Sequence, residues 1–154
     1  MAVACFYYDF ASREAQSPTN MLGSLLKQLL SGLGAIPVEI MQKFRDQKKA
    51  IGGRRLRLLD IVKMCLAVTS LQRTFICVDA LDECVPGHRL EVLGALGQIL
   101  RGSPNTRIFM TGRSYIRGVV ERELGERITN VSIMSRADDI ATYLRARLGK
   151  DTTP

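Results

Sequence analysis

Carboxylates gather directly after one apolar run of the sequence. Phe75 to Glu83 reads FICVDALDE, so four apolar residues lead to Asp79, and Asp82 and Glu83 follow closely. A carboxylate at the carboxyl edge of a sheet can hold Mg²⁺ through a bound water, because this ion prefers oxygen ligands and keeps much of its hydration. In nucleotide hydrolases the ion bridges the β- and γ-phosphates while a second carboxylate orients water. The spacing predicts Asp79 as the metal carboxylate and Asp82 or Glu83 as the second group. The alternative is structural, with Asp79 capping a turn and the other two on a solvated loop.

Two further patterns could carry chemistry, and both favour a structural interpretation. Cys84 and His88 stand at i and i+4, which superficially suggests a Cys–His nucleophile; we expect instead a packed thiol and a residue at a helix start. The four cysteines include no C-x-x-C pair and accompany a single histidine, so a structural zinc site is not expected. All four are predicted to be reduced thiols. The G-x-S-x-G motif of serine hydrolases is absent.

Positive charge is concentrated in one segment. The net charge is +7, and the window from Lys43 to Arg57 holds seven cations against the single carboxylate of Asp46. Such a cluster could bind nucleic-acid phosphate. The one aromatic residue of the window, Phe44, is expected to face inward on a helix and so is not available for base stacking. We therefore favour a solvated loop between helices and expect no nucleic-acid partner.

The elements that must position these residues alternate between strand and helix. Apolar runs predict strands at residues 2–10, 74–78, 106–111 and 127–133, and helical periodicity or capping signals predict the intervening helices. Ser17 and Pro18 start a helix that ends at Gly32, a short helix runs from Pro37 to about Arg45, and a third spans about residues 55–71. Leucines at residues 90–100 predict a fourth helix, and residues 116–124 predict a fifth. Ile140, Leu144 and Leu148 predict a last helix, which begins at a capping box formed by Ser135 and Asp138.

This alternation predicts one α/β domain with a parallel sheet covered on both faces and a ligand at the carboxyl ends of the strands. No apolar run approaches the ~18 residues of a membrane span, and residues 1–10 do not read as a secretory signal. We therefore expect a cytoplasmic protein without a membrane partner.

The string DALDEC after a buried strand resembles the Walker B segment of NACHT-type signalling NTPases of the STAND group, especially the nephrocystin-like N-terminal domains of fungal NACHT proteins. Three further segments resemble the family in order. FYYDF is similar to its second core strand, SPTNMLGSLLKQLL to the helix that follows, and RIFMTGR to its fourth strand with the sensor arginine. The resemblance covers about residues 2–148.

The resemblance implies a P-loop NTPase-like fold of the additional-strand type and a role for each site residue. Asp79 would be the Mg²⁺ carboxylate, Asp82 and Glu83 the acidic pair, and Arg113 the sensor that reaches the γ-phosphate of ATP or GTP. A guanidinium suits that role because it donates bidentately to phosphate oxygens. The family usually has Ser-Arg-Pro where this chain has Gly112-Arg113-Ser114.

One family motif has no counterpart in the sequence. A P-loop requires G-x-x-x-x-G-K-[ST], and the chain's one Gly-Lys pair, Gly149-Lys150, is followed by aspartate. The chain therefore looks like a NACHT domain that lacks the first strand and the P-loop, with residues 1–149 as a partial domain and 150–154 as a tail. In the family the sheet order is 5-1-4-3-2, so the missing first strand would lie between the strands at 127–133 and 106–111. Without it, these two strands must pair directly or leave exposed edges.

From this we expect marginal stability, weak or no nucleotide binding by this chain alone, and partners among other domains or protomers of a NACHT assembly. The other hypothesis is a non-catalytic fragment that contacts partner proteins through its helices.

Overall fold

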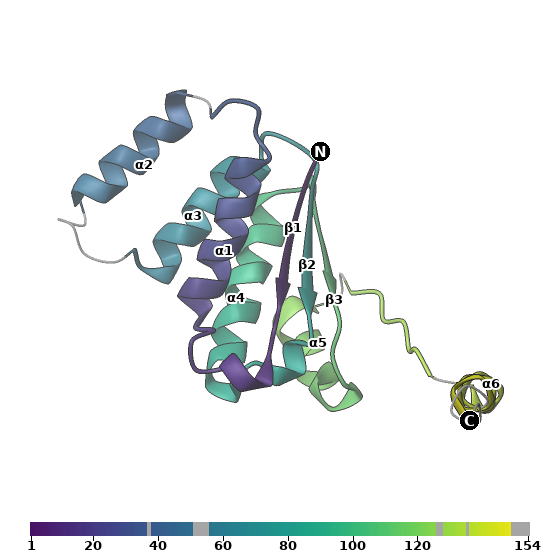
Figure 1. The fold of residues 1–154 in the computed structure, drawn as a ribbon. Helices are drawn as coiled ribbons and strands as arrows, with labels where there is room; N and C mark the ends of the chain where they lie inside the picture. Colours follow the sequence, from purple (N-terminus) through teal and green to yellow (C-terminus); the bar gives the residue numbers. More distant parts are fainter. Residues whose placement is uncertain (37, 51–55, 126–127, 135, 149–154) are drawn as a thin grey trace.

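Three parallel strands form the centre of the molecule (Figure 1). The computed structural model describes residues 1–36, 38–50, 56–125, 128–134 and 136–148. Strands β1 (Ala2–Tyr7), β2 (Thr74–Asp79) and β3 (Thr106–Met110) lie in the order β1-β2-β3. Cys5, Cys77 and Phe109 share one row of the register. The chain is thus an α/β protein with a parallel sheet, and its strands adjoin in the expected order.

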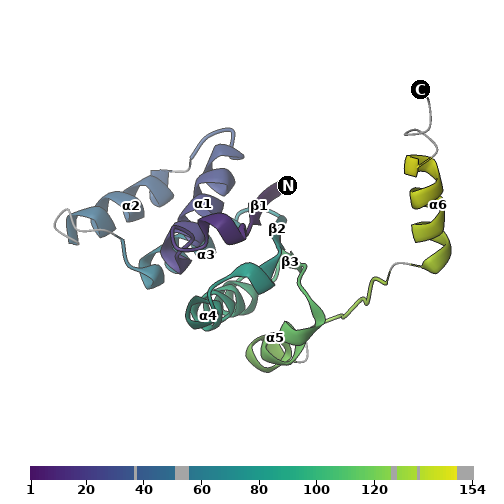
Figure 2. The same cartoon turned by 60° about the horizontal axis from the view of Figure 1, so that its bottom comes forward.

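Helices pack against one face of this sheet. The main ones are α1 (Pro18–Ser31), α3 (Leu58–Thr69) and α4 (Pro86–Gly102), with α5 (Arg117–Leu124) against α4 (Figures 1 and 2). The expected leucine stripe of α1 is buried, and Ser17 caps the helix by accepting a hydrogen bond from the Asn20 N–H at 3.3 Å. Buried side chains of α1, α3 and α4 meet Ala4, Ile76 and Val78 of the strands.

We predicted helices on both faces of the sheet, but within residues 1–36, 38–50, 56–125, 128–134 and 136–148 no helix covers the opposite face. Along β1 and β2 the alternate residues Val3, Cys5, Tyr7, Phe75 and Cys77 are exposed or only half-buried. The strands step in one direction across the sheet, and right-handed crossovers then put every connecting helix on the same side. We call the uncovered side, made by Val3, Cys5, Tyr7, Phe75, Cys77 and Phe109, the open face.

The predicted fourth strand is also corrected. Residues 128–134 form no regular element, and Val131, Ile133 and Met134 are 78–89% exposed. Among the described residues nothing pairs with the outer edge of β3. An isolated β-branched run has no ladder to join, so local propensity alone does not make it a strand.

Several element boundaries differ from the predicted ones. β1 ends at Tyr7 because Asp9 caps a 3-10 turn, η1 (Phe10–Ser12), and Phe10 is therefore exposed rather than in the core with Tyr8. Helix α2 (Val38–Ala50) continues well beyond Arg45, so the first part of the basic window is helical. Helix α4 begins at Pro86, whose missing N–H suits a first helical turn.

The C-terminal helix α6 (Ala137–Leu148) stands apart from the rest of the molecule (Figures 1 and 2). None of its residues is buried. The capping residue predicted for it, Ser135, and the expected boundary at 149/150 lie outside the described residues. None of the helices in the described ranges is both long and apolar enough to cross a membrane.

Candidate functional site

The carboxyl edge of the sheet brings together groups from β2 and β3. Asp79 ends β2, and Thr111 follows β3 directly. The Thr111 hydroxyl donates a hydrogen bond to Oδ1 of Asp79 and accepts one from the Ala80 N–H at 3.0 Å. Backbone bonds from Thr111 N to Val78 O and from Leu81 N to Thr111 O, both 3.0 Å, fix the loop around it. Thr111 therefore orients the Asp79 carboxylate.

Ala80 adopts a conformation that alanine rarely takes. Its φ of 53° and ψ of 44° are left-handed, which costs an L-residue roughly 1–2 kcal/mol. The bond to Thr111 holds it there. The chain turns sharply at this point, and η2 (Leu81–Glu83) brings Asp82 back toward the end of β3.

Asp82 and Arg113 form the second pair of the site. The Arg113 N–H donates to Oδ1 of Asp82 at 3.2 Å, and Arg113 Nε lies 3.4 Å from Oδ2. The Asp82 side chain is 8% exposed, whereas that of Arg113 is 77% exposed. The guanidinium is thus held at its base and open to solvent at its tip, a geometry that suits it to a solvent-borne anion.

The remaining predicted site residue, Glu83, points elsewhere. Its Oε2 accepts a hydrogen bond from the Phe10 N–H at 2.8 Å, which ties the turn after β1 to the turn after β2. The structure thus brings Asp79, Asp82 and Arg113 to one edge of the sheet and gives Glu83 a structural contact.

Two residues that support the site were not predicted from the sequence. Arg89 on α4 donates from its terminal nitrogen to the carbonyls of Asp82 at 2.9 Å and Cys84 at 2.8 Å. Thr111 is the other, and the signal that could have found it is its place directly after an apolar run next to Gly112. A Cβ at Gly112 would come within 2.6 Å of Cδ1 of Ile116, so this loop is built around glycine.

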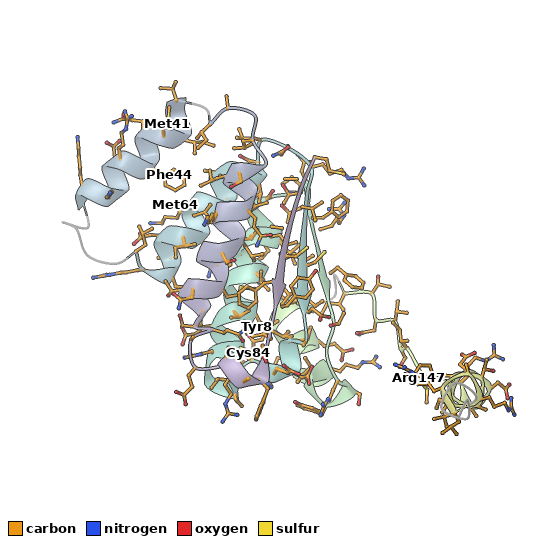
Figure 3. The ribbon with its side chains drawn as sticks, viewed as in Figure 1. Tyr8, Met41, Phe44, Met64, Cys84 and Arg147 are labelled. Atoms are coloured by element: carbon orange, nitrogen blue, oxygen red, sulfur yellow. The ribbon has the colours of Figure 1, made fainter. Side chains whose placement is uncertain are left out.

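Cys84 and His88 do not form a nucleophile pair. Cys84 is buried, and its Sγ lies 3.6 Å from the Val85 carbonyl. Burial raises the pKa of this thiol, although Tyr8 and Arg89 oppose the shift. A thiol with a raised pKa stays protonated and is a poor nucleophile. Figure 3 shows Cys84 beside Tyr8 at the carboxyl end of the sheet, as expected of a packed thiol.

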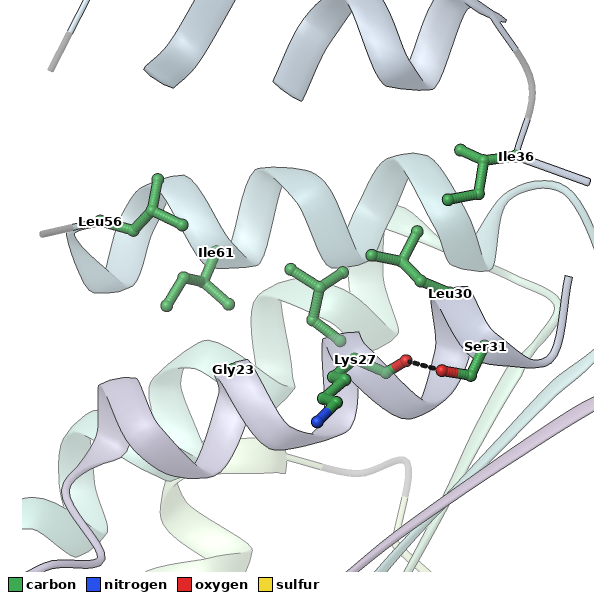
Figure 4. Close-up of a pocket in the computed structure, with 8 residues that line it drawn as sticks. Gly23, Lys27, Leu30, Ser31, Ile36, Leu56 and Ile61 are labelled. Atoms are coloured by element: carbon green, nitrogen blue, oxygen red, sulfur yellow. Dashed lines mark hydrogen bonds between the residues drawn. The ribbon is translucent and has the colours of Figure 1, made fainter. Parts of the chain in front are cut away.

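The other hollows and clusters of the molecule offer little chemistry. An apolar cavity of about 380 Å³ lies between α1 and α3 (Figure 4), and Lys27 is its single charged lining residue. Helix α2 faces this region with Phe44, which points toward α3 (Figure 3), and exposes Arg45, Lys48 and Lys49. In the described part of the chain, no three His, Cys, Asp or Glu side chains gather as a metal cluster.

Fold and site together define an α/β protein whose parallel sheet ends in a polar edge of carboxylate, hydroxyl and guanidinium, an arrangement compatible with a P-loop-like fold. The chain belongs to the family described as nephrocystin 3, N-terminal, whose model matches residues 1–113. That match includes all of the site residues above. No curated protein and no solved structure matches the chain.

Proposed function

We propose that this chain is part of a NACHT-type nucleotide-binding switch domain that uses ATP or GTP with Mg²⁺ in signal transduction. The observation that carries the proposal is the Asp79 carboxylate at the end of β2, oriented by Thr111 of the neighbouring strand. Membership in the nephrocystin 3 N-terminal family agrees with it. A sequence without G-x-x-x-x-G-K-[ST] lacks the amides and lysine that hold phosphates, so we expect the 154 residues alone to be an inactive NTPase.

Asp79 fits a water-mediated magnesium ligand. Thr111 occupies Oδ1 and leaves Oδ2 without a hydrogen bond from the described residues. One carboxylate, with waters and phosphate oxygens, is a common set for Mg²⁺ in phosphoryl-transfer sites. The bound ion would neutralise charge on the phosphates. In this proposal Asp79 would bind a water molecule of the Mg²⁺ hydration shell, and Thr111 would keep the carboxylate in the orientation that this contact needs.

Arg113 is proposed as the sensor of the γ-phosphate. Its Nε lies 3.4 Å from Oδ2 of Asp82, and the rest of the guanidinium is open to solvent because the arginine side chain is 77% exposed. A phosphate can therefore approach the guanidinium from solvent. Asp82 would position Arg113 in the empty state and orient water once Arg113 has moved. Glu83, whose carboxylate accepts a hydrogen bond from the Phe10 N–H, would hold the neighbouring turn in place.

The test begins with the transcript. Sequencing its 5′ end should find an in-frame G-x-x-x-x-G-K-[ST] a few tens of residues upstream of Met1. In that longer polypeptide, Asp79→Asn should lower Mg-ATP or Mg-GTP turnover by about 10- to 100-fold, as loss of an outer-shell metal partner typically does. Arg113→Ala should also lower turnover, because charge on the γ-phosphate loses its guanidinium partner.

The matched controls are Asp138→Asn and Arg145→Ala on α6, which remove the same charges away from the site and should leave turnover unchanged. Full turnover in both site variants would refute the site assignment. Micromolar Mg-ATP binding by residues 1–154 alone, measured by calorimetry, would refute the expected inactivity of this chain.

The second candidate is a non-catalytic module that binds a protein partner. The apolar side chains of the open face favour it, since Tyr7 and Phe109 are 66% and 65% exposed. A module that works only through that surface should not bind nucleotide. Calorimetric titration of the longer polypeptide with Mg-ATP therefore separates the two functions.

A further inference from the structure

The open face is an apolar surface without a cover among the described residues. Val3, Tyr7 and Phe109 are 53–66% exposed, and the half-buried Cys5, Phe75 and Cys77 lie between them. The register places Cys5 beside Cys77 and Val3 beside Phe75, so these side chains form a continuous patch. Arg107 lies beside Phe75 on the same face, and its guanidinium donates to the backbone carbonyls of Pro104 and Thr106. Parallel sheets are almost always covered on both faces, and patches of this kind mark binding surfaces.

Helix α6 carries a mainly apolar face that packs against none of the described elements. Ile140, Leu144 and Leu148 stand at i, i+4 and i+8 and are 47–64% exposed, and Tyr143 beside them is 61% exposed. This spacing makes one stripe along the helix, with Asp138, Thr142 and Arg145 on other sides. Arg147 lies at the edge of the stripe, where its guanidinium contacts the Tyr143 side chain. The chain therefore carries two exposed apolar surfaces, one on the sheet and one on α6.

Topology leaves α6 as the element that can reach the open face. Helices α1, α3 and α4 are committed to the other side, and α5 packs on α4. Figure 2 shows α6 on the side of the sheet opposite to these helices. We propose that α6 of the same chain docks its Ile140–Leu144–Leu148 stripe on the open face and closes the second layer of the α/β sandwich.

The dimensions allow this docking. Residues 125–136 connect α5 to α6, and a tether of that length spans up to ~40 Å when extended. A helix of 12 residues is about 18 Å long, and strands of six residues are about 20 Å long. The helix thus matches the length of the face that it would cover.

The native cysteines provide the test. Cys5 and Cys77 lie on the open face, whereas Cys65 and Cys84 are 1% and 2% exposed in the helix-covered core. The experiment measures the rate of alkylation of each thiol by N-ethylmaleimide, by peptide mass spectrometry, in the 154-residue chain and two variants. Leu144→Asp puts a charge in the apolar stripe, and Ala146→Asp adds the same charge on the far side of α6 as a matched control.

Docking predicts that Cys5 and Cys77 react at least about tenfold faster in Leu144→Asp than in the unmodified chain or in Ala146→Asp. Cys65 and Cys84 should stay slow in all three, which verifies that the core remains folded. Equal rates for Cys5 and Cys77 in the unmodified chain and Leu144→Asp would overturn the proposal. A dimer by light scattering, with protection lost on dilution, would assign the face to a second copy and would also overturn it.

Discussion

At the scale of single residues, the candidate site depends on one hydroxyl. Thr111 donates to Asp79 and accepts from the Ala80 N–H, so it connects β3 to β2 and holds the left-handed Ala80. The sequence indicated Asp79 from the apolar run before it, but Thr111 lies 32 positions away in the chain. Only the parallel pairing of β2 with β3 brings the two together.

Replacing Thr111 by valine should destabilise the fold. Valine keeps the shape but removes the hydroxyl, which leaves the Ala80 N–H without its acceptor and Asp79 without its donor. A buried group that loses its partner costs about 1–3 kcal/mol, so the free energy of unfolding in urea should fall by about that amount. Thr142→Val removes an exposed bond to the Asp138 carbonyl on α6 and should change it by less than about 0.5 kcal/mol. Equal effects of the two substitutions would contradict this role of Thr111.

At the scale of elements, α1 both packs on the sheet and protects its edge. Strand β1 is an edge strand, and the outward peptide groups of Cys5 are paired with the Gln28 side chain of α1. The Cys5 N–H donates to Gln28 Oε1 at 2.9 Å, and Gln28 Nε2 donates to the Cys5 carbonyl at 2.8 Å. A free strand edge is a template for aggregation, and Gln28 blocks it at this point.

Gln28→Ala should expose the β1 edge. Two part-buried hydrogen bonds are lost, which at about 0.5–1.5 kcal/mol each lowers the free energy of unfolding by about 1–3 kcal/mol. Light scattering at fixed concentration should also show faster aggregation. The control is Gln42→Ala on α2, where the glutamine bonds only the exposed Asp46. If both variants aggregate at the same rate, Gln28 does not protect the edge.

Helix α4 provides a second comparison within one element. Leu93 is fully buried and Leu90 is 46% exposed. Leu93→Ala should cost about 2–5 kcal/mol, because the buried side chain leaves a cavity, and Leu90→Ala should cost less than about 1 kcal/mol. Chemical denaturation of both variants measures the difference, and similar values would mean that α4 does not pack on the sheet as described.

At the scale of the whole molecule, one layer of helices covers one face of the sheet, and its core contains ionisable groups that burial keeps neutral. Burial raises the pKa of the Cys65 thiol from 9.0 to about 12. Burial also raises the pKa of Tyr8, and a hydrogen bond with Cys84 adds to that shift. The stability of this core should therefore depend on alkaline pH.

The sign follows from the raised pKa. Above pH 9 the Cys65 thiol of the unfolded chain loses its proton while the folded chain keeps it until about pH 12, so unfolding becomes easier as the pH rises through this window. The slope contributed by one thiol is up to about 1.4 kcal/mol per pH unit. Urea unfolding at pH 7.5 and 10.5 should show a smaller loss in Cys65→Ala than in the unmodified chain. An identical pH dependence in the two proteins would exclude Cys65 as a source of the loss of stability at alkaline pH.

Much of this architecture follows from local sequence signals. Apolar runs located the three strands of the sheet, Ser17 with Pro18 located the start of α1, and the DALDE string located the carboxylates at the end of β2. The signals failed where an element needs a partner. Residues 128–134 have the composition of a strand but pair with no strand in the described part of the chain, and Phe10 follows a strand that Asp9 ends early.

The sequence by itself determined the α/β class and the carboxylates at the end of β2, because hydrophobic periodicity and the residues that follow an apolar run are local properties of the chain. Only the tertiary structure decided that Thr111 orients Asp79, that Asp82 pairs with Arg113 and that no described helix covers one face of the sheet. These features arise from register and crossover handedness, which join residues far apart in the chain.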